Sequence, residues 1–188
     1  HPDGDHIGGL FRVVKGCPVR RAWVHDPTRH IDLYRLTARL KRMPAPYASA
    51  AAKITRSMEQ CCSFLQLLDR QGIPRYEPFA GQSAGYLRVL GPRQNYYEEL
   101  LAQFEDLEGV FVEDERQEPV YLSLAESEDA LNEDDTTSAE NNSSVISGLE
   151  IDGRIYLFTG DAGVPALWQA LDDYRVGKVN WLDVPHHG

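Results

Sequence analysis

The first six residues hold four side chains of the kinds that bind metal ions: His1, Asp3, Asp5 and His6. Imidazole nitrogens and carboxylate oxygens bind divalent cations when they converge, and buried charges need a partner or a metal. In an extended segment, residues two apart point to the same side. His1 and Asp3 can therefore bind one ion while Asp5 and His6 turn toward a second. The alternative is a polar surface loop that is rich in His and Asp.

Two later segments carry side chains of the same kinds. Gly160-Asp161 follows an apolar stretch, which places a carboxylate at the end of a predicted strand, and His186 and His187 follow another apolar stretch. Taken alone, Gly-Asp is typical of a turn, and the two histidines fit an ordinary loop equally well. The occurrence of all three segments in this order favours a two-metal site.

The three segments together resemble the signature of a known superfamily. His1–Gly9 is similar to the HxHxDHxGG motif of the metallo-β-lactamase superfamily, with Asp3 in place of the second histidine. This HxDxDH form, followed by Thr159–Asp161 and then Val184–Gly188, resembles the hydrolase domain of ComEC-type competence proteins and their soluble relatives. Weaker similarity covers three further segments, Val89–Pro92, Tyr96–Leu100 and Asn141–Ser144.

The resemblance implies an α/β fold, the αββα sandwich of the metallo-β-lactamases, with the metals at the edge between the two sheets. We expect a single metallo-hydrolase domain over residues 1–188. The strands that normally precede the first metal loop are missing from this sequence. We therefore expect either a sandwich that is incomplete on its N-terminal side or a longer parent protein.

The resemblance also implies a role for each residue of the motifs. The expected metal ligands are His1, Asp3, Asp5, His6, Asp161 and His187. His1 and Asp3 would hold the first metal. Asp5, His6 and His187 would hold the second, and Asp161 would bridge the two. His186 would support the ligands or give a proton to the leaving group, so that Asp5 and His186 are the expected catalytic residues.

The first metal needs one more ligand in this superfamily, usually a histidine between the two main motifs. Asn141 or Asn142 lies at about the right place in the chain, and an amide oxygen is a weak substitute. His25 and His30 come too early, inside the basic segment, and we expect them to be surface or loop residues.

The ligand set points to hydrolysis. Imidazoles with a bridging carboxylate suit Zn²⁺, and the replacement of a histidine by Asp3 makes Mn²⁺ an equal candidate. Two such ions about 3.5–4 Å apart lower the pKa of a bridging water and bind both the attacking and the leaving oxygen. The sequence therefore predicts a hydrolase that uses two divalent metal ions and a metal-bridged hydroxide.

The charge of the chain is unevenly distributed. The net charge is −10, yet residues 105–140 alone carry fourteen acidic residues and one basic residue. Residues 12–56, directly after the metal loop, hold eleven Lys or Arg against two acids. This basic run could bind phosphates, although the sequence slightly favours a solvated helix face.

The basic run favours phosphodiester bonds as the substrate, in DNA or RNA, which would make the protein a nuclease or phosphodiesterase. A hydrolase of small esters, lactones or choline phosphate is the first alternative. The second is a non-catalytic interaction module that keeps the fold and binds a protein partner through an acidic, flexible insertion at about 113–142.

Cysteine content and hydropathy bear on the compartment. The cysteines are Cys17, Cys61 and Cys62, an odd number with two adjacent, which favours free thiols and a reducing compartment. No segment resembles a signal peptide or a membrane span. These features favour the cytoplasm.

Local patterns predict the elements that must position the site. We expect helices over 47–70, 95–107 and 164–174, and strands over 86–90, 144–150, 154–159 and 179–184. Asp152-Gly153 is a strong signal for a tight hairpin turn between the two middle strands. Asn95 is the expected N-cap of the second helix. Residues 17–32 should form a strand-like segment and a loop.

Overall fold

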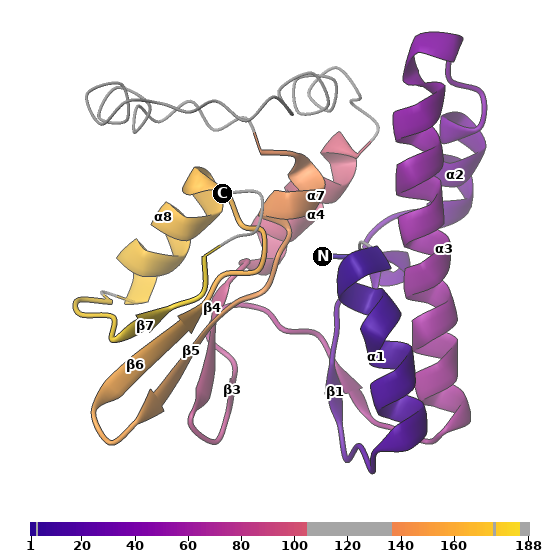
Figure 1. Cartoon of the computed structure of the whole chain (residues 1–188). Helices are drawn as coiled ribbons and strands as arrows, with labels where there is room; N and C mark the ends of the chain where they lie inside the picture. Colours follow the sequence, from indigo (N-terminus) through magenta and orange to yellow (C-terminus); the bar gives the residue numbers. More distant parts are fainter. Residues whose placement is uncertain (3, 105–136, 175, 185–188) are drawn as a thin grey trace, which may run out of the picture.

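The chain forms a mixed α/β fold whose two halves, one helical and one built on a sheet, lie side by side (Figure 1). The computed structural model describes residues 1–2, 4–104, 137–174 and 176–184. The helices are α1 (Gly4–Gly16), α2 (Leu33–Leu40), α3 (Ala48–Arg70), α4 (Gln94–Gln103), α7 (Ala139–Asn142) and α8 (Val164–Tyr174). The strands are β1 (Ala22–Trp23), β2 (Arg75–Tyr76), β3 (Ser83–Ala84), β4 (Leu87–Gly91), β5 (Ile146–Ile151), β6 (Arg154–Phe158) and β7 (Trp181–Leu182).

The helical half is organised around α3. Its apolar residues recur every three or four positions, so that Ile54, Met58, Leu65 and Leu68 share one buried face. Helix α1 packs on one part of that face through Ile7 and Val14, and α2 packs on another. Each fully buried leucine or isoleucine contributes roughly 1.5–3 kcal/mol by leaving water. The position of α1, and hence of the opening motif, is therefore fixed by core packing.

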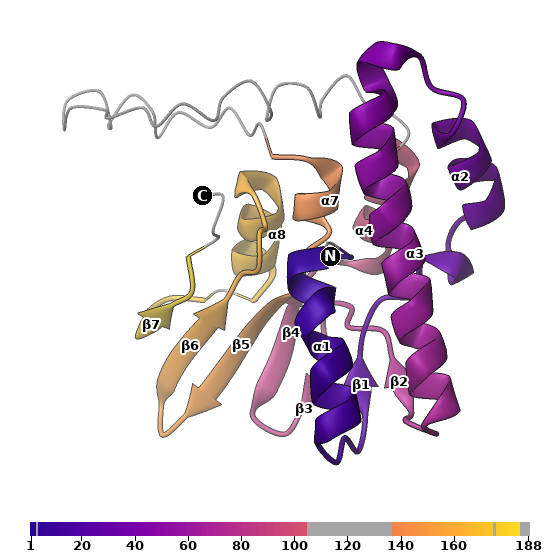
Figure 2. The same ribbon diagram turned by 45° about the vertical axis from the view of Figure 1, so that its right-hand side comes forward.

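A five-stranded mixed sheet forms the other half, in the order β3-β4-β5-β6-β7. All neighbours are antiparallel except β6 and β7, which run parallel and are joined through α8. The small residues Ala166 and Ala170 let α8 pack closely on the apolar residues of the sheet. Figure 2 shows the ribbon of α8 beside this sheet. Because β5 and β6 are antiparallel, the start of β5 and the end of β6 lie at one end of the sheet. Both views place α7 and the start of the chain at this same end.

A separate two-stranded sheet joins β1 and β2 in parallel. Ala22 N and Val24 N donate to main-chain oxygens of Pro74 and Tyr76. Only two residues of each strand pair, so local sequence patterns carry little signal for them. This sheet nevertheless sets the path of residues 21–25, which border the cavity beside the candidate site.

Several expected elements are confirmed. Helix α3 begins one residue after the expected start and ends at Arg70, and α8 spans Val164–Tyr174 as expected. The hairpin between β5 and β6 turns at Asp152 and Gly153, whose φ angles of 50° and 70° fit the predicted tight turn. These features depend on local sequence, which explains why they could be predicted.

Other expectations need correction. Asn95 is not a cap, because α4 begins at Gln94 after Arg93, which makes no side-chain cap bond. The final strand is limited to Trp181–Leu182, since only these residues pair with β6. Helix α2 was not expected; Asp32 caps it by accepting a hydrogen bond from Arg35 N. The segment expected to be a flexible insertion ends in α7, where residues 140–142 are buried, and its earlier part lies outside the described residues.

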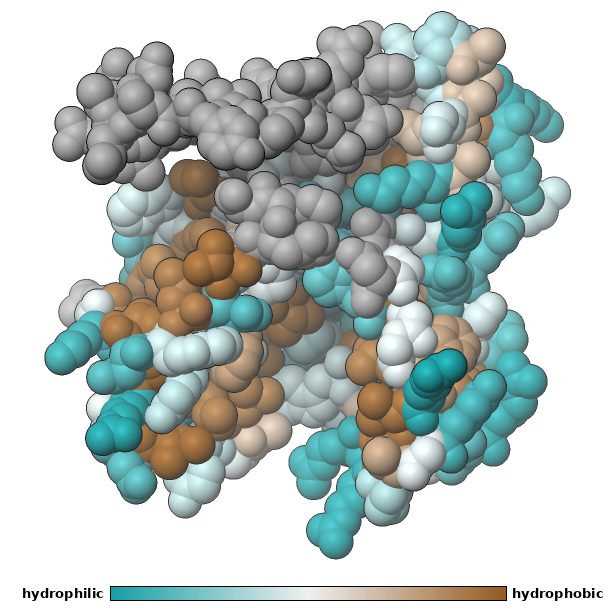
Figure 3. Space-filling view, in the orientation of Figure 1, coloured by the Kyte–Doolittle hydropathy of each residue, from teal (hydrophilic) through white to brown (hydrophobic). Residues whose placement is uncertain are grey.

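The surface differs between the two halves. In Figure 3 apolar side chains gather over α8 and β7, where Trp168, Trp181 and Leu182 are about half exposed. Hydrophilic side chains cover the outer side of the helical half. Within the described ranges, no helix combines the length and the apolar character needed to cross a membrane.

Candidate metal centre

Three residues bring imidazole and carboxylate atoms to one point beside the start of α1. His1 precedes the helix, His6 lies in its first turn, and Asp161 follows β6. His6 Nε2 lies 3.0 Å and His1 Nε2 lies 3.4 Å from Asp161 Oδ2. One ligand atom from each residue can be chosen so that all lie within 4.8 Å of one another. Such convergence is what a shared cation requires.

The turn after β6 directs Asp161 toward the histidines. Gly160 has a φ angle of 57°, a left-handed conformation that glycine adopts without strain. A Cβ atom at this glycine would lie 3.0 Å from the Cβ of Ser144, so the turn also needs a residue without a side chain. Asp161 N then donates to Ser144 Oγ at 3.1 Å. The Thr159 hydroxyl anchors the turn from the other side by donating to Asp183 O.

Burial is unequal among the three ligand-type residues. The side chains of His1 and Asp161 are 1% and 2% exposed, whereas that of His6 is 33% exposed. A buried carboxylate is costly unless hydrogen-bond donors or a cation compensate its charge. The His6 imidazole is within hydrogen-bond distance of this carboxylate at 3.0 Å, the His1 imidazole lies beside it at 3.4 Å, and a cation could lie among the three groups. Access from solvent is on the His6 side.

The structure brings together three of the expected ligands and leaves the others undecided. His1, His6 and Asp161 converge, although the extended geometry expected over residues 1–6 is wrong from Gly4 onward because α1 begins there. Asp5 lies in that helix, but its side chain is outside the described residues. The remaining expected residues Asp3, His186 and His187 also lie outside them. Their ligand roles, and the catalytic roles of Asp5 and His186, stay predictions.

Helix α7 holds the two asparagines considered as an additional ligand. Asn141 and Asn142 are both buried. The Asn142 side chain accepts a hydrogen bond from Gly163 N at 3.2 Å and donates one to Thr137 O at 3.2 Å. These contacts tie α7 to the segment after β6. A ligand role for either asparagine stays a prediction.

His25 and His30 lie in loops, as one of the two expected alternatives had it, but neither is exposed on the surface. His25 is 8% exposed and stacks on Tyr97 with ring centroids 4.2 Å apart. The His30 side chain is 6% exposed and bonds to Glu77 and Glu98. Tertiary packing on aromatic rings explains both positions. Neither histidine belongs to the converging group of described residues.

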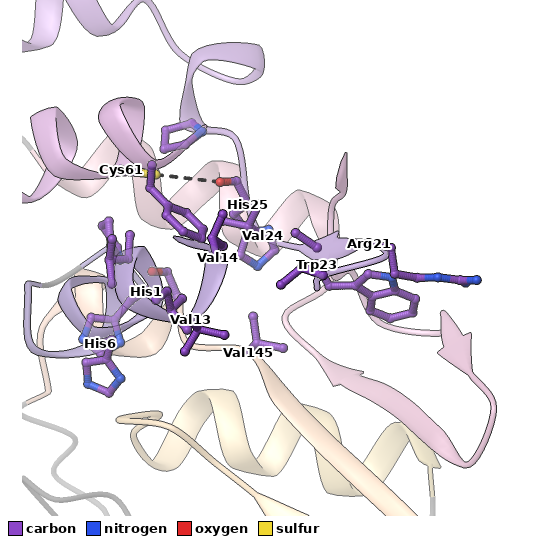
Figure 4. A pocket seen from close by; sticks show the side chains of 18 of the residues that line it. His1, His6, Val13, Val14, Arg21, Trp23, Val24, His25, Cys61 and Val145 are labelled. Carbon is purple, nitrogen blue, oxygen red and sulfur yellow. Dashed lines mark hydrogen bonds between the residues drawn. The ribbon is translucent and has the colours of Figure 1, made fainter. Parts of the chain in front are cut away.

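A cavity of about 440 Å³ adjoins the converging residues. Figure 4 shows His1 and His6 on one side, valines of α1 between, and residues 21–25 along the other, with Arg21 extending outward. The walls are mostly apolar. His25 is a buried polar residue of this lining, and among the described residues its ring nitrogens have no hydrogen-bond partner. Burial lowers the pKa of His25 well below the ordinary value of 6.5.

Ser144 is a site residue that sequence reasoning missed. Its hydroxyl contacts His1 Nδ1 at 2.8 Å in addition to Asp161 N. The signal was available in the hairpin, because β5 and β6 pair Ser147 with Phe158. Continuing that antiparallel register by three positions brings Ser144 opposite Asp161. A register counted back from the Asp152-Gly153 turn would have found it.

Comparison with known proteins assigns no family to this chain. No protein-family model, no curated protein and no solved structure matches it. Any function must therefore be argued from the residues and their geometry. What the geometry offers is a buried carboxylate shared by two imidazoles, open on one side and beside a largely apolar cavity.

Proposed function

We propose that this chain is a metal-dependent hydrolase of the metallo-β-lactamase type that acts on phosphodiester bonds. The observation that carries the proposal is the convergence on one point of His1 and His6, at the start of the chain, with Asp161, which lies 155 positions after His6. The antiparallel hairpin that positions Asp161, and the mixed sheet around it, are consistent with half of an αββα sandwich. The opening motif and the Gly-Asp turn keep the order that the superfamily has.

The donor set fits a divalent cation. Two imidazole nitrogens and one carboxylate oxygen suit Zn²⁺, and Mn²⁺ accepts the same ligands. When bound, such an ion polarises the bond under attack and lowers the pKa of water. The residues of the chain hold and orient: Asp161 contributes the buried negative charge, His1 is held rigidly inside, and His6 faces the open side where a substrate enters.

Charge favours a phosphodiester substrate. All eleven Lys and Arg residues between positions 12 and 56 are exposed. Arg21 is among them and also borders the cavity beside the centre. Exposed cations near a metal centre attract anionic substrates and hold phosphate groups. Two of them make ion pairs with nearby acids: Arg29 contacts Asp26 and Glu77, and Lys41 contacts Glu59.

The apolar cavity favours a second candidate function, hydrolysis of small esters or lactones. A polyanionic strand cannot use a mostly apolar wall, whereas an uncharged acyl or ring group buries its surface there. Both candidates share the same metal centre and the same ligands. They differ in the substrate that the surroundings of the centre accept.

The test compares two carboxylates of the full chain. Wild type, Asp161→Asn and Glu77→Gln would be titrated with MnCl₂ and ZnCl₂ by calorimetry. They would then be assayed with bis-p-nitrophenyl phosphate, single-stranded DNA and p-nitrophenyl acetate. Loss of partners outside the ligand sphere already costs about 10–100-fold in affinity or activity, so loss of a direct ligand should cost at least about 100-fold. Glu77→Gln should stay close to wild type, because Glu77 lies outside the centre.

The outcomes separate the hypotheses. Cleavage of the phosphodiesters that disappears in Asp161→Asn supports the proposal, and cleavage of the ester alone supports the second candidate. Wild-type protein that binds neither ion, or an Asp161→Asn variant that binds and cleaves as wild type does, would overturn the proposed function.

A further inference from the structure

The hydroxyl of Ser144 lies between two of the three converging residues. Its Oγ is 2.8 Å from His1 Nδ1 and 3.1 Å from Asp161 N. The residue is 1% exposed, so water cannot substitute for these contacts. A single buried atom thus links the ring of one expected ligand to the main chain of another.

Hydrogen-bond accounting limits how this hydroxyl is used. A serine oxygen can accept two hydrogen bonds and donate one. Asp161 N–H donates, which occupies one acceptor position. The contact with His1 then has two forms: the hydroxyl donates its proton to Nδ1, or Nδ1–H donates to the second acceptor position. Each form corresponds to one tautomer of the neutral imidazole.

The surroundings of His1 select a different form with and without a cation. His1 Nε2 lies 3.4 Å from Asp161 Oδ2, where an N–H is favourable and a lone pair would face another lone pair. Without a metal, Nε2 therefore carries the proton and Ser144 donates to Nδ1. To bind a cation, Nε2 must present its lone pair, so the proton moves to Nδ1 and Ser144 accepts it.

We propose that Ser144 is a positioning residue of the metal centre, whose hydroxyl rotates to hold His1 in the metal-free tautomer or in the metal-binding tautomer. The inference rests on the proposed function for its metal-bound state. It explains why a hydroxyl, which can both donate and accept, stands here: a purely donating or purely accepting group would stabilise only one of the two states.

Contacts of its backbone and of its side chain fix the position of Ser144. Ser144 N donates to Asn141 O at 2.9 Å, which fixes the backbone directly after α7. Gly160 packs against its side chain across the register of β5 and β6, where any Cβ would come within 3.2 Å of Oγ. The serine therefore has almost no freedom except rotation of its hydroxyl hydrogen.

The neighbouring Ser143 supplies a matched control. It is 0% exposed, and its hydroxyl donates to Glu140 O at 2.6 Å, a contact within the turn that ends α7. Ser143→Ala and Ser144→Ala remove the same atom one residue apart. Circular dichroism and thermal unfolding of both variants would show that the fold is kept.

The first measurement is metal affinity of the full chain, by calorimetric titration with ZnCl₂. We expect Ser144→Ala to weaken binding by about 10–100-fold, as loss of a partner that orients a ligand does, and Ser143→Ala to remain within about 3-fold of wild type. Equal affinities of the two variants would overturn the inference while leaving the proposed function intact.

The second measurement is the ¹⁵N chemical shift of the His1 ring, in histidine-labelled protein at a pH where the ring is neutral. Metal-free wild type should carry the proton on Nε2, and addition of ZnCl₂ should move it to Nδ1. Metal-free Ser144→Ala should show altered His1 shifts, whereas Ser143→Ala should not. This arm works even if wild type binds no ion, so failure of the proposed function is distinguishable. A metal-free His1 protonated on Nδ1, or unchanged by Ser144→Ala, contradicts the inference.

Discussion

Among the described residues, two clusters of imidazole and carboxylate groups have opposite arrangements. At the candidate metal centre two imidazoles point to one carboxylate oxygen, Asp161 Oδ2. In the second cluster one imidazole lies between two carboxylates: His30 Nε2 is 2.9 Å from Glu77 Oε1, and His30 Nδ1 is 2.9 Å from Glu98 Oε1. The residue types are the same, and the sequence distinguishes neither cluster by composition.

The difference lies in where the lone pairs and protons meet. The two nitrogens of His30 lie on different sides of its ring, so in the protonated imidazole each can donate a hydrogen bond to its own carboxylate, and this cluster needs no ion. Although burial acts to lower the pKa of His30, the hydrogen bonds to Glu77 and Glu98 outweigh it and raise the pKa above 6.5. At Asp161, in contrast, the ligand atoms converge. Convergence, rather than the density of His and acidic residues, marks a metal site.

The largest expected effect is stabilisation by metal at one cluster alone. At a free ZnCl₂ concentration about 100 times the dissociation constant, binding should stabilise the folded chain by about 2.7 kcal/mol. For a chain of this size, each kcal/mol raises Tm by about 2–4 °C. Differential scanning fluorimetry with a chelator control should therefore show a rise of about 5–11 °C in wild type. His6→Ala should abolish the rise and His30→Gln should keep it; the reverse pattern would assign the ion to the wrong cluster.

Sequence reasoning reached part of the site because the motif residues are close in sequence or follow strands. His1, His6 and Asp161 were expected together, and the structure brings them together. Ser144 escaped because its role depends on the register of β5 against β6, a pairing between residues 17 positions apart. The burial of the His30 side chain was missed because its partners, Glu77 and Glu98, are 47 and 68 residues away.

The elements of the fold also differ in whether local sequence could predict them. Helix α3 and the β5–β6 hairpin could be predicted, because apolar spacing and the Asp152-Gly153 turn are local signals. Of the parallel pair, β1 lies within residues 17–32, where a strand-like segment was expected, but its bounds and its pairing with β2 could not be predicted, since each strand has two residues and is defined by its partner. The mixed α/β class followed from the order of helices and strands, whereas the packing of the two halves depends on contacts that no local pattern encodes.

A smaller effect is expected when the second cluster loses its imidazole. His30→Gln removes the charge-assisted hydrogen bond to Glu77, a bond of a type that contributes about 1.5–3 kcal/mol. Urea unfolding at about pH 6, where the raised pKa keeps His30 charged, should show a loss in this range. Calorimetry with ZnCl₂ should give the wild-type affinity. A variant as stable as wild type would mean that the two carboxylates gain nothing from the imidazolium.

The smallest expected effect is a change in how stability depends on pH, and it separates His30 from His25. The two histidines contact the same rings, Phe79 and Tyr97, yet their pKa values shift in opposite directions. The raised pKa of His30 gives a contribution that is complete below about pH 6.5 and is lost as pH rises through the folded-state value. Burial lowers the pKa of His25, so its contribution is present above about pH 6.5 and is lost as pH falls.

The two single variants should therefore change opposite sides of the curve of unfolding free energy against pH. The unfolding free energy of wild type, from urea titrations between about pH 5 and pH 8.5, should decline on both sides of a maximum. His25→Phe keeps an aromatic ring against Tyr97 and should flatten the acid limb, because no buried imidazole remains to be protonated. His30→Gln should flatten the alkaline limb, so that its deficit relative to wild type shrinks as pH rises. If His25→Phe keeps the wild-type slope below pH 6.5, burial of a neutral His25 does not cause the loss of stability in acid, and carboxylates elsewhere in the chain must account for it.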